Sequence, residues 1–68
     1  MKLSARNMLK GKVMDVKLGA VMASVKLEVG GGNKITALIS VDSVKALKLA
    51  KGDKAVAIIK ATEVIIGK

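Results

Sequence analysis

The chain has 68 residues and a formal net charge of +8, with 13 basic residues against five acidic ones. It contains no Cys and no His, which excludes disulfide bonds and the commonest metal-ligand clusters. It also lacks Phe, Tyr and Trp, the side chains on which single-stranded nucleic acid usually stacks. We expect one domain over residues 1–68. Since so small a domain buries only about 60% of its unfolded surface, and 51% of the residues are hydrophobic, we expect it to form a homo-oligomer.

Alternating apolar and polar residues predict three strands in the first half of the chain. Residues 8–18 form the first, with Gly11 as a bulge or bend. Residues 21–29 alternate strictly and form the second, and residues 34–40 form the third. The intervening segment, residues 30–33, is a hairpin turn, because its glycine triplet lacks the Gly-Lys-Ser/Thr ending and the following helix of a phosphate-binding loop.

A short helix is predicted after the third strand. Ser40 can cap it, Asp42 lies at the positive end of its dipole, and Val44 and Leu47 share a face at helical spacing. Two interpretations of Ser40 and Ser43 are open. The two serines cap the first turn, or they present hydroxyl groups to an anion together with free backbone N–H groups.

Two further strands are predicted near the C-terminus. Residues 55–59 are apolar without a polar alternate, so both faces are expected to be buried. Residues 64–66 are β-branched and apolar, and pack on the protein's own barrel or on a neighbouring subunit. Five strands with this one helix indicate an all-β fold, a small OB-type Greek-key barrel with one short helix between strands 3 and 4.

Two segments near the ends of the chain combine hydrogen-bond donors with a cation. They are Ser4-Ala5-Arg6-Asn7 and Lys60-Ala61-Thr62. Side by side they would form a pocket that donates hydrogen bonds and accepts none, which suits a small, fully ionised oxyanion. Arg6 is the single arginine, and its planar fork suits an oxyanion better than a lysine ammonium group does.

Other functional classes have less support. The five acidic residues are scattered and the serines have no His to activate them, so we expect no enzymatic activity. The alternative function is a basic OB-type nucleic-acid-binding module, which the net charge favours and the missing aromatic side chains oppose. No apolar run approaches the roughly 18 residues that cross a bilayer, and there is no signal-peptide core, so a cytoplasmic protein is expected.

Five segments form a recognisable set from about Leu3 to the C-terminus. They are Ser4-Ala5-Arg6-Asn7, Leu9-Lys10-Gly11-Lys12-Val13, Gly31-Gly32-Asn33-Lys34-Ile35-Thr36, Ile39-Ser40-Val41-Asp42-Ser43-Val44 and Ile59-Lys60-Ala61-Thr62-Glu63-Val64. Together they resemble the molybdenum-pterin-binding protein family, also called Mop proteins or molbindins. The first and last segments are the most specific pair.

The resemblance implies an OB-type barrel that assembles as a hexamer, a trimer of dimers, and holds molybdate or tungstate at subunit interfaces. The implied role is oxyanion storage and homeostasis in the cytoplasm. Molybdenum would be bound only as the oxyanion, with no metal-ligating side chains, no pterin cofactor, and neither nucleic acid nor membrane as partner. The implied oxyanion-binding residues are Ser4, Ala5, Arg6, Lys60 and Ala61, with Ser40 and Ser43 from a neighbouring subunit.

Overall fold

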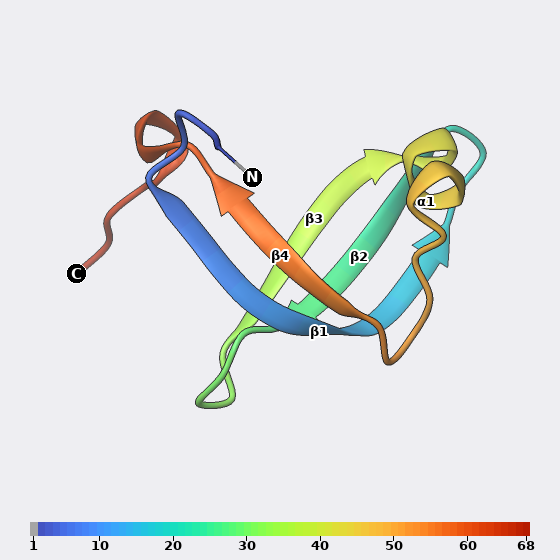
Figure 1. The fold of residues 1–68 in the computed structure, drawn as a ribbon, viewed down its shortest axis with the longest axis horizontal. Coiled ribbons are helices and arrows are strands. Elements are labelled where there is room, and N and C mark those ends of the chain that lie inside the picture. The colour runs from blue at the N-terminus through green and yellow to red at the C-terminus, as the bar shows by residue number, and fades with distance from the viewer. Residues whose placement is uncertain (1) are drawn as a thin grey trace.

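Four strands form one antiparallel sheet in the computed structural model, which describes residues 2–68 (Figure 1). β1 spans Asn7–Leu18, β2 Met22–Glu28, β3 Lys34–Ser40 and β4 Lys54–Ile59. The order in the sheet is β3-β2-β1-β4, so hairpins join the first three strands and the fourth returns beside the first. This is the Greek-key order.

A single short helix, α1 (Val41–Leu47), leads from β3 toward β4 within the described range. Ser40 caps it, because its side chain accepts a hydrogen bond from the Ser43 N–H at 3.0 Å. Lys48 ends it in the left-handed conformation, with φ at 53°. The predicted all-β class with one short helix between strands 3 and 4 is therefore confirmed. Within α1 only Val44 is buried, whereas Leu47 is 66% exposed.

β1 is long enough to pair with two different strands along its length. Its first half, residues 7–12, pairs with β4, and its second half, residues 12–18, pairs with β2. The register shifts between Val13 and Asp15, so the bulge predicted at Gly11 lies further along the strand. At Gly11 a Cβ atom would instead overlap the backbone carbonyl oxygen of Glu28. Glycine therefore lets β1 and the end of β2 approach closely where the sheet curls.

The concave face of the sheet carries an entirely aliphatic core. Val13 is the most deeply buried side chain, with 1% of its surface exposed, at the point where the pairing of β1 changes from β4 to β2. Each fully buried Val or Leu contributes about 1.5–3 kcal/mol relative to an exposed one. The buried set comprises Val13, Ala23, Val25, Leu27, Val44 and Ala57.

The predicted fifth strand, residues 64–66, does not form within one chain. After β4 the chain makes a short 3-10 helix, η1 (Ala61–Glu63), and then runs on without a strand partner (Figure 1). Ile65 is 92% exposed and Ile66 is 86% exposed. The strand prediction is wrong for the single chain because a strand needs a neighbouring backbone to accept and donate its hydrogen bonds.

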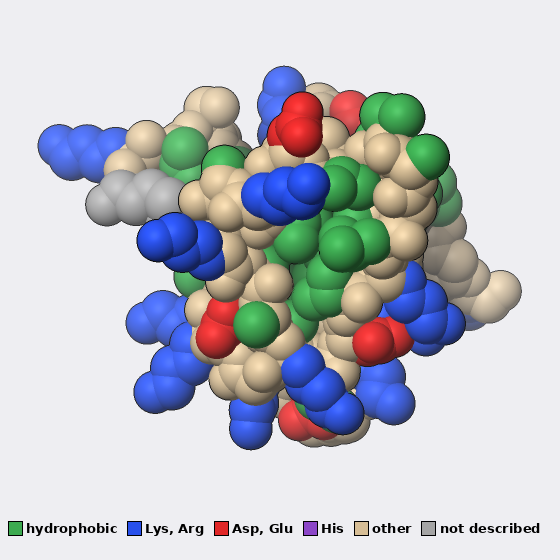
Figure 2. Space-filling view, turned by 90° about the vertical axis from the view of Figure 1, so that its right-hand side faces the viewer, with side chains coloured by type: hydrophobic (Ala, Val, Ile, Leu, Met, Phe, Trp, Pro, Cys, Tyr) green, Lys and Arg blue, Asp and Glu red, His purple; other side chains and the backbone are tan. Residues whose placement is uncertain are grey.

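The outer face of β4 is apolar and open as well. Val56 is 38% exposed and Ile58 is 43% exposed, so burial of both faces of this strand is not achieved within one chain. Met8, opposite Ile58 on β1, is 49% exposed. Figure 2 shows hydrophobic side chains gathered on one open face of the molecule, with Lys and Arg side chains around them. Apolar surface on this scale is typical of proteins that associate.

Replacing Gly11 tests the close approach of β1 and β2. Gly11→Ala is expected to lower the free energy of unfolding by about 1–3 kcal/mol, the usual cost of forcing extra volume into a packed structure. The measurement is urea denaturation. Gly67→Ala is the matched control, because nothing lies within 4 Å of its added methyl group. Equal stability of the two variants would contradict the close approach.

Candidate functional site

The pairing of β1 with β4 brings the two donor segments together. Asn7, the first residue of β1, lies opposite Ile59, the last residue of β4. Arg6 precedes Asn7 and Lys60 follows Ile59, so both cationic residues lie just beyond the last pair of the β1–β4 ladder. Figure 1 shows the start of β1 and the end of β4 close together at one end of the sheet.

Ser4, Ala5, Arg6, Lys60 and Ala61 make up what we call the terminal cluster. Ala5 is half-buried, and the other four are exposed. Lys60 is the N-cap residue of η1, and the leading N–H groups of a helical turn have no acceptor within the turn. The cluster therefore offers a hydroxyl, a guanidinium, an ammonium and backbone N–H groups, of which all can donate to an oxyanion.

Ser40 and Ser43 form a second cluster, the helix cluster, at the start of α1. The two hydroxyl oxygens lie 2.8 Å apart and share a hydrogen bond, which leaves one hydroxyl proton for a ligand. The Ser43 N–H donates to Ser40 Oγ at 3.0 Å, and the Val41 N–H donates to the carbonyl of Val21 at 2.8 Å. The expectation of free backbone N–H groups here is therefore wrong for Val41 and Ser43, because both already have acceptors within the chain.

The terminal cluster and the helix cluster lie at opposite ends of the sheet (Figure 1). Ser40 pairs with Met22, at the end of the sheet where β1 finishes, whereas the terminal cluster adjoins the start of β1. β1 is 12 residues long, and a strand rises about 3.3 Å per residue. One chain cannot enclose a single tetrahedral anion with both clusters. They can meet around the same anion only when they belong to different copies.

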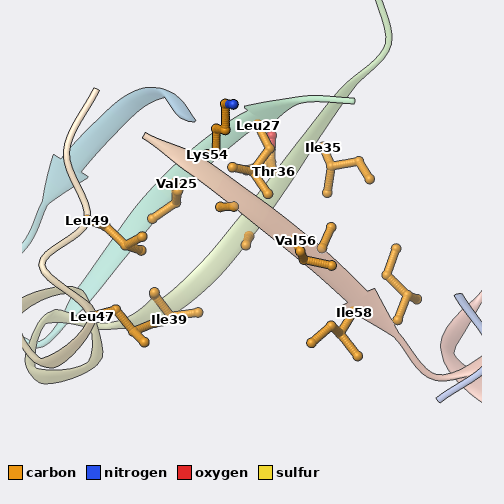
Figure 3. A pocket seen from close by; sticks show the side chains of 14 residues that line it. Val25, Leu27, Ile35, Thr36, Ile39, Leu47, Leu49, Lys54, Val56 and Ile58 are labelled. Atoms are coloured by element: carbon orange, nitrogen blue, oxygen red, sulfur yellow. The ribbon is translucent and has the colours of Figure 1, made fainter. Parts of the chain in front are cut away.

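An apolar groove of about 750 Å³ runs along the open side of the sheet (Figure 3). β3 and β4 are the two edge strands, so the barrel is not closed between them. An ionised oxyanion would lose its hydration in this groove without gaining enough hydrogen bonds. Its lining includes Val25, Ile39, Leu47, Val56 and Ile58, and Lys54 is its one charged residue.

Within residues 2–68, no group of three or more His, Cys, Asp and Glu side chains could hold a metal ion. None of the helices in this range has the length and apolar character needed to cross a membrane.

The chain is similar to known proteins over nearly its whole length. Residues 3–66 match the TOBE domain. The chain is 53% identical over 66 residues to molybdenum-pterin-binding protein 1 of Clostridium pasteurianum, an alignment that covers 97% of each chain. The chain belongs to the TOBE-domain family of molybdenum-pterin-binding proteins. The family resemblance predicted from the five sequence segments is thus confirmed.

Solved structures agree with this assignment. A molybdate-binding protein from Sporomusa ovata has a TM-score of 0.93 and 41% sequence identity, with the whole of both chains covered. The cytoplasmic molybdate-binding protein ModG, solved with molybdate bound, has a TM-score of 0.86 and 48% identity. That match covers 90% of this chain and 43% of ModG. Similarity at this level confirms the OB-like barrel.

Substitution of Ser40 tests its role as the N-cap of α1. Ser40→Ala is expected to lower the free energy of unfolding by about 1 kcal/mol, because the Ser43 N–H loses its acceptor. Ser40→Asp should retain nearly all of the stability, since Asp caps as well as Ser. Thermal unfolding followed by circular dichroism measures both variants. A stable Ser40→Ala variant would show that the cap contributes nothing.

Proposed function

We propose that this chain binds molybdate or tungstate as an intact oxyanion, held between subunits, for storage and homeostasis in the cytoplasm. The observation that supports the proposal is the β1–β4 pairing, because its last pair, Asn7 with Ile59, is followed outward by the two segments that contain the proposed donors. The ligand class is supported by relatives and solved structures that are described as binding molybdenum or molybdate. ModG, which is described as cytoplasmic, supports the location.

The chemistry of the donors favours molybdate over commoner anions. Molybdate at neutral pH is a tetrahedral dianion with no proton to donate, so a lining of N–H and O–H groups satisfies every oxygen. Phosphate is partly protonated near neutrality and would leave its O–H group without an acceptor. Sulfate carries no proton at this pH, so it must be rejected by its smaller size. The pterin named in the relatives is not proposed as a ligand, because the chain has no aromatic side chain on which its ring could stack.

Assembly into a homo-oligomer is the second part of the proposal, with a hexamer built as a trimer of dimers. The separation of the terminal and helix clusters supports it, because a complete donor shell then needs more than one copy. The net charge of +8 on each chain adds a further reason. Dianions bound at the interfaces would relieve the repulsion between highly positive subunits.

The apolar surfaces indicate how copies would meet. We infer that residues 64–66 of one copy dock along the groove between β3 and β4 of another. Ile65 and Ile66 are almost fully exposed, and the groove is lined mainly by aliphatic side chains. The unpaired edges of β3 and β4 also offer backbone groups that an incoming strand can use. This docking would remove both exposed isoleucines from water.

Truncating either cation should weaken oxyanion binding. Arg6→Ala or Lys60→Ala is expected to cost roughly 1.5–3 kcal/mol of molybdate binding free energy, the range for hydrogen bonds to charged groups. Calorimetric titration of the purified protein with molybdate measures this loss.

Lys34→Ala is the matched control for Lys60→Ala. It removes the same charge from an exposed position at the start of β3, level with Lys12 and so six residues along β1 from Arg6. It should change the affinity little. Unchanged affinity in both Arg6→Ala and Lys60→Ala would remove these residues from the site.

A carboxylate introduced within residues 64–66 tests whether this segment docks on another copy. Ile65→Asp is expected to shift the protein toward smaller species in sedimentation velocity, because a carboxylate would have to be buried in an apolar groove. Ala50→Asp places the same charge on another exposed apolar residue, in the turn before β4, and should sediment as the parent does. If Ile65→Asp sediments as the parent does, residues 64–66 do not dock in the groove between β3 and β4 of another copy.

A further inference from the structure

Asn7 makes an unusual hydrogen bond for this molecule. Its side-chain Nδ2 donates to the backbone carbonyl of Ile59 at 3.2 Å, across 52 positions of sequence. The other three side-chain hydrogen bonds found within residues 2–68 each join residues only three positions apart. The Asn7 amide is thus the one side chain, among those described, that ties two strands together.

This hydrogen bond lies at the end of the β1–β4 ladder, next to the terminal cluster. Asn7 and Ile59 form the last pair of the β1–β4 ladder, and the next residues outward are Arg6 and Lys60. Strand ends and chain termini are poorly ordered unless they are tied down. The Asn7 side chain is half-buried, so water competes less for the Ile59 carbonyl than it would at an exposed position. A bond here would keep the two donor segments from separating.

We propose that Asn7 is a positioning residue for the oxyanion site. Its amide fixes the end of β4 and so holds Lys60 and Ala61 beside Ser4 and Arg6, without itself touching the anion. This inference rests on the proposed function. An amide suits the task because a neutral side chain can donate to a carbonyl without bringing negative charge near a dianion. An Asp of the same size would lose the donor and add that charge.

A positioning role for Asn7 predicts that its effect on molybdate affinity depends on Lys60. If Asn7 acts through the placement of Lys60, then replacing Lys60 should remove most of the effect of replacing Asn7. A residue that only stabilised the fold would instead lower affinity equally in either background. A double-mutant cycle separates the two cases, because residues that act independently show additive effects.

The experiment measures molybdate affinity by calorimetry for Asn7→Ala, Lys60→Ala and the double variant. Asn7→Ala alone is expected to weaken binding roughly 3- to 10-fold, the loss of one ordinary hydrogen bond. In the Lys60→Ala background the same change should cost less than about twofold. Asn33→Ala is the matched control. Asn33 is exposed in the turn between β2 and β3 and should leave the affinity unchanged.

A second measurement follows the segment itself, without ligand. Hydrogen exchange of the Glu63 and Val64 amides, which close η1 on the carbonyls of Lys60 and Ala61, should be faster in Asn7→Ala than in the parent or in Asn33→Ala. Parent-like affinity in Asn7→Ala, or additive losses in the double variant, would overturn the positioning role while leaving the proposed function intact. A parent protein that bound no oxyanion would overturn both.

Discussion

The antiparallel pairing of β1 with β4 is the contact on which the proposed site depends. Without it, the residues before Asn7 and the residues after Ile59 would be separate, mobile chain ends. The pairing is made possible by the connection through α1, which carries the chain from the edge strand β3 back to the free edge of β1. A Greek-key connection of this kind therefore turns two terminal segments into one donor surface.

Only part of the candidate site could be foreseen from the sequence. Donor-rich segments at the two ends can be recognised because their residue types determine their chemistry. The distance between the terminal cluster and the pair Ser40 and Ser43 depends on strand register, which no local pattern contains. The same holds for the Val41 N–H, whose acceptor is the carbonyl of Val21, a residue 20 positions earlier. The sequence could suggest which groups are donors, and the fold was needed to show which of them lie at the same end of the sheet.

The fold was more predictable, because alternation and capping are local signals. β3 spans Lys34–Ser40 as expected from its pattern, and Ser40 caps α1. The errors concern features that depend on remote contacts. The bulge lies between Val13 and Asp15, within the part of β1 that pairs with β2, and not at the glycine before it. Residues 64–66 have strand-like composition but no strand neighbour in their own chain.

The central claim is that several copies of this chain jointly enclose an oxyanion with hydrogen-bond donors. Native mass spectrometry of the purified protein, recorded with and without added molybdate, tests it most directly. Assemblies of several 7.0 kDa chains are expected, with masses that increase in steps of one molybdate. A single chain that stayed monomeric, or an assembly that took up no molybdate or tungstate at millimolar excess, would contradict it.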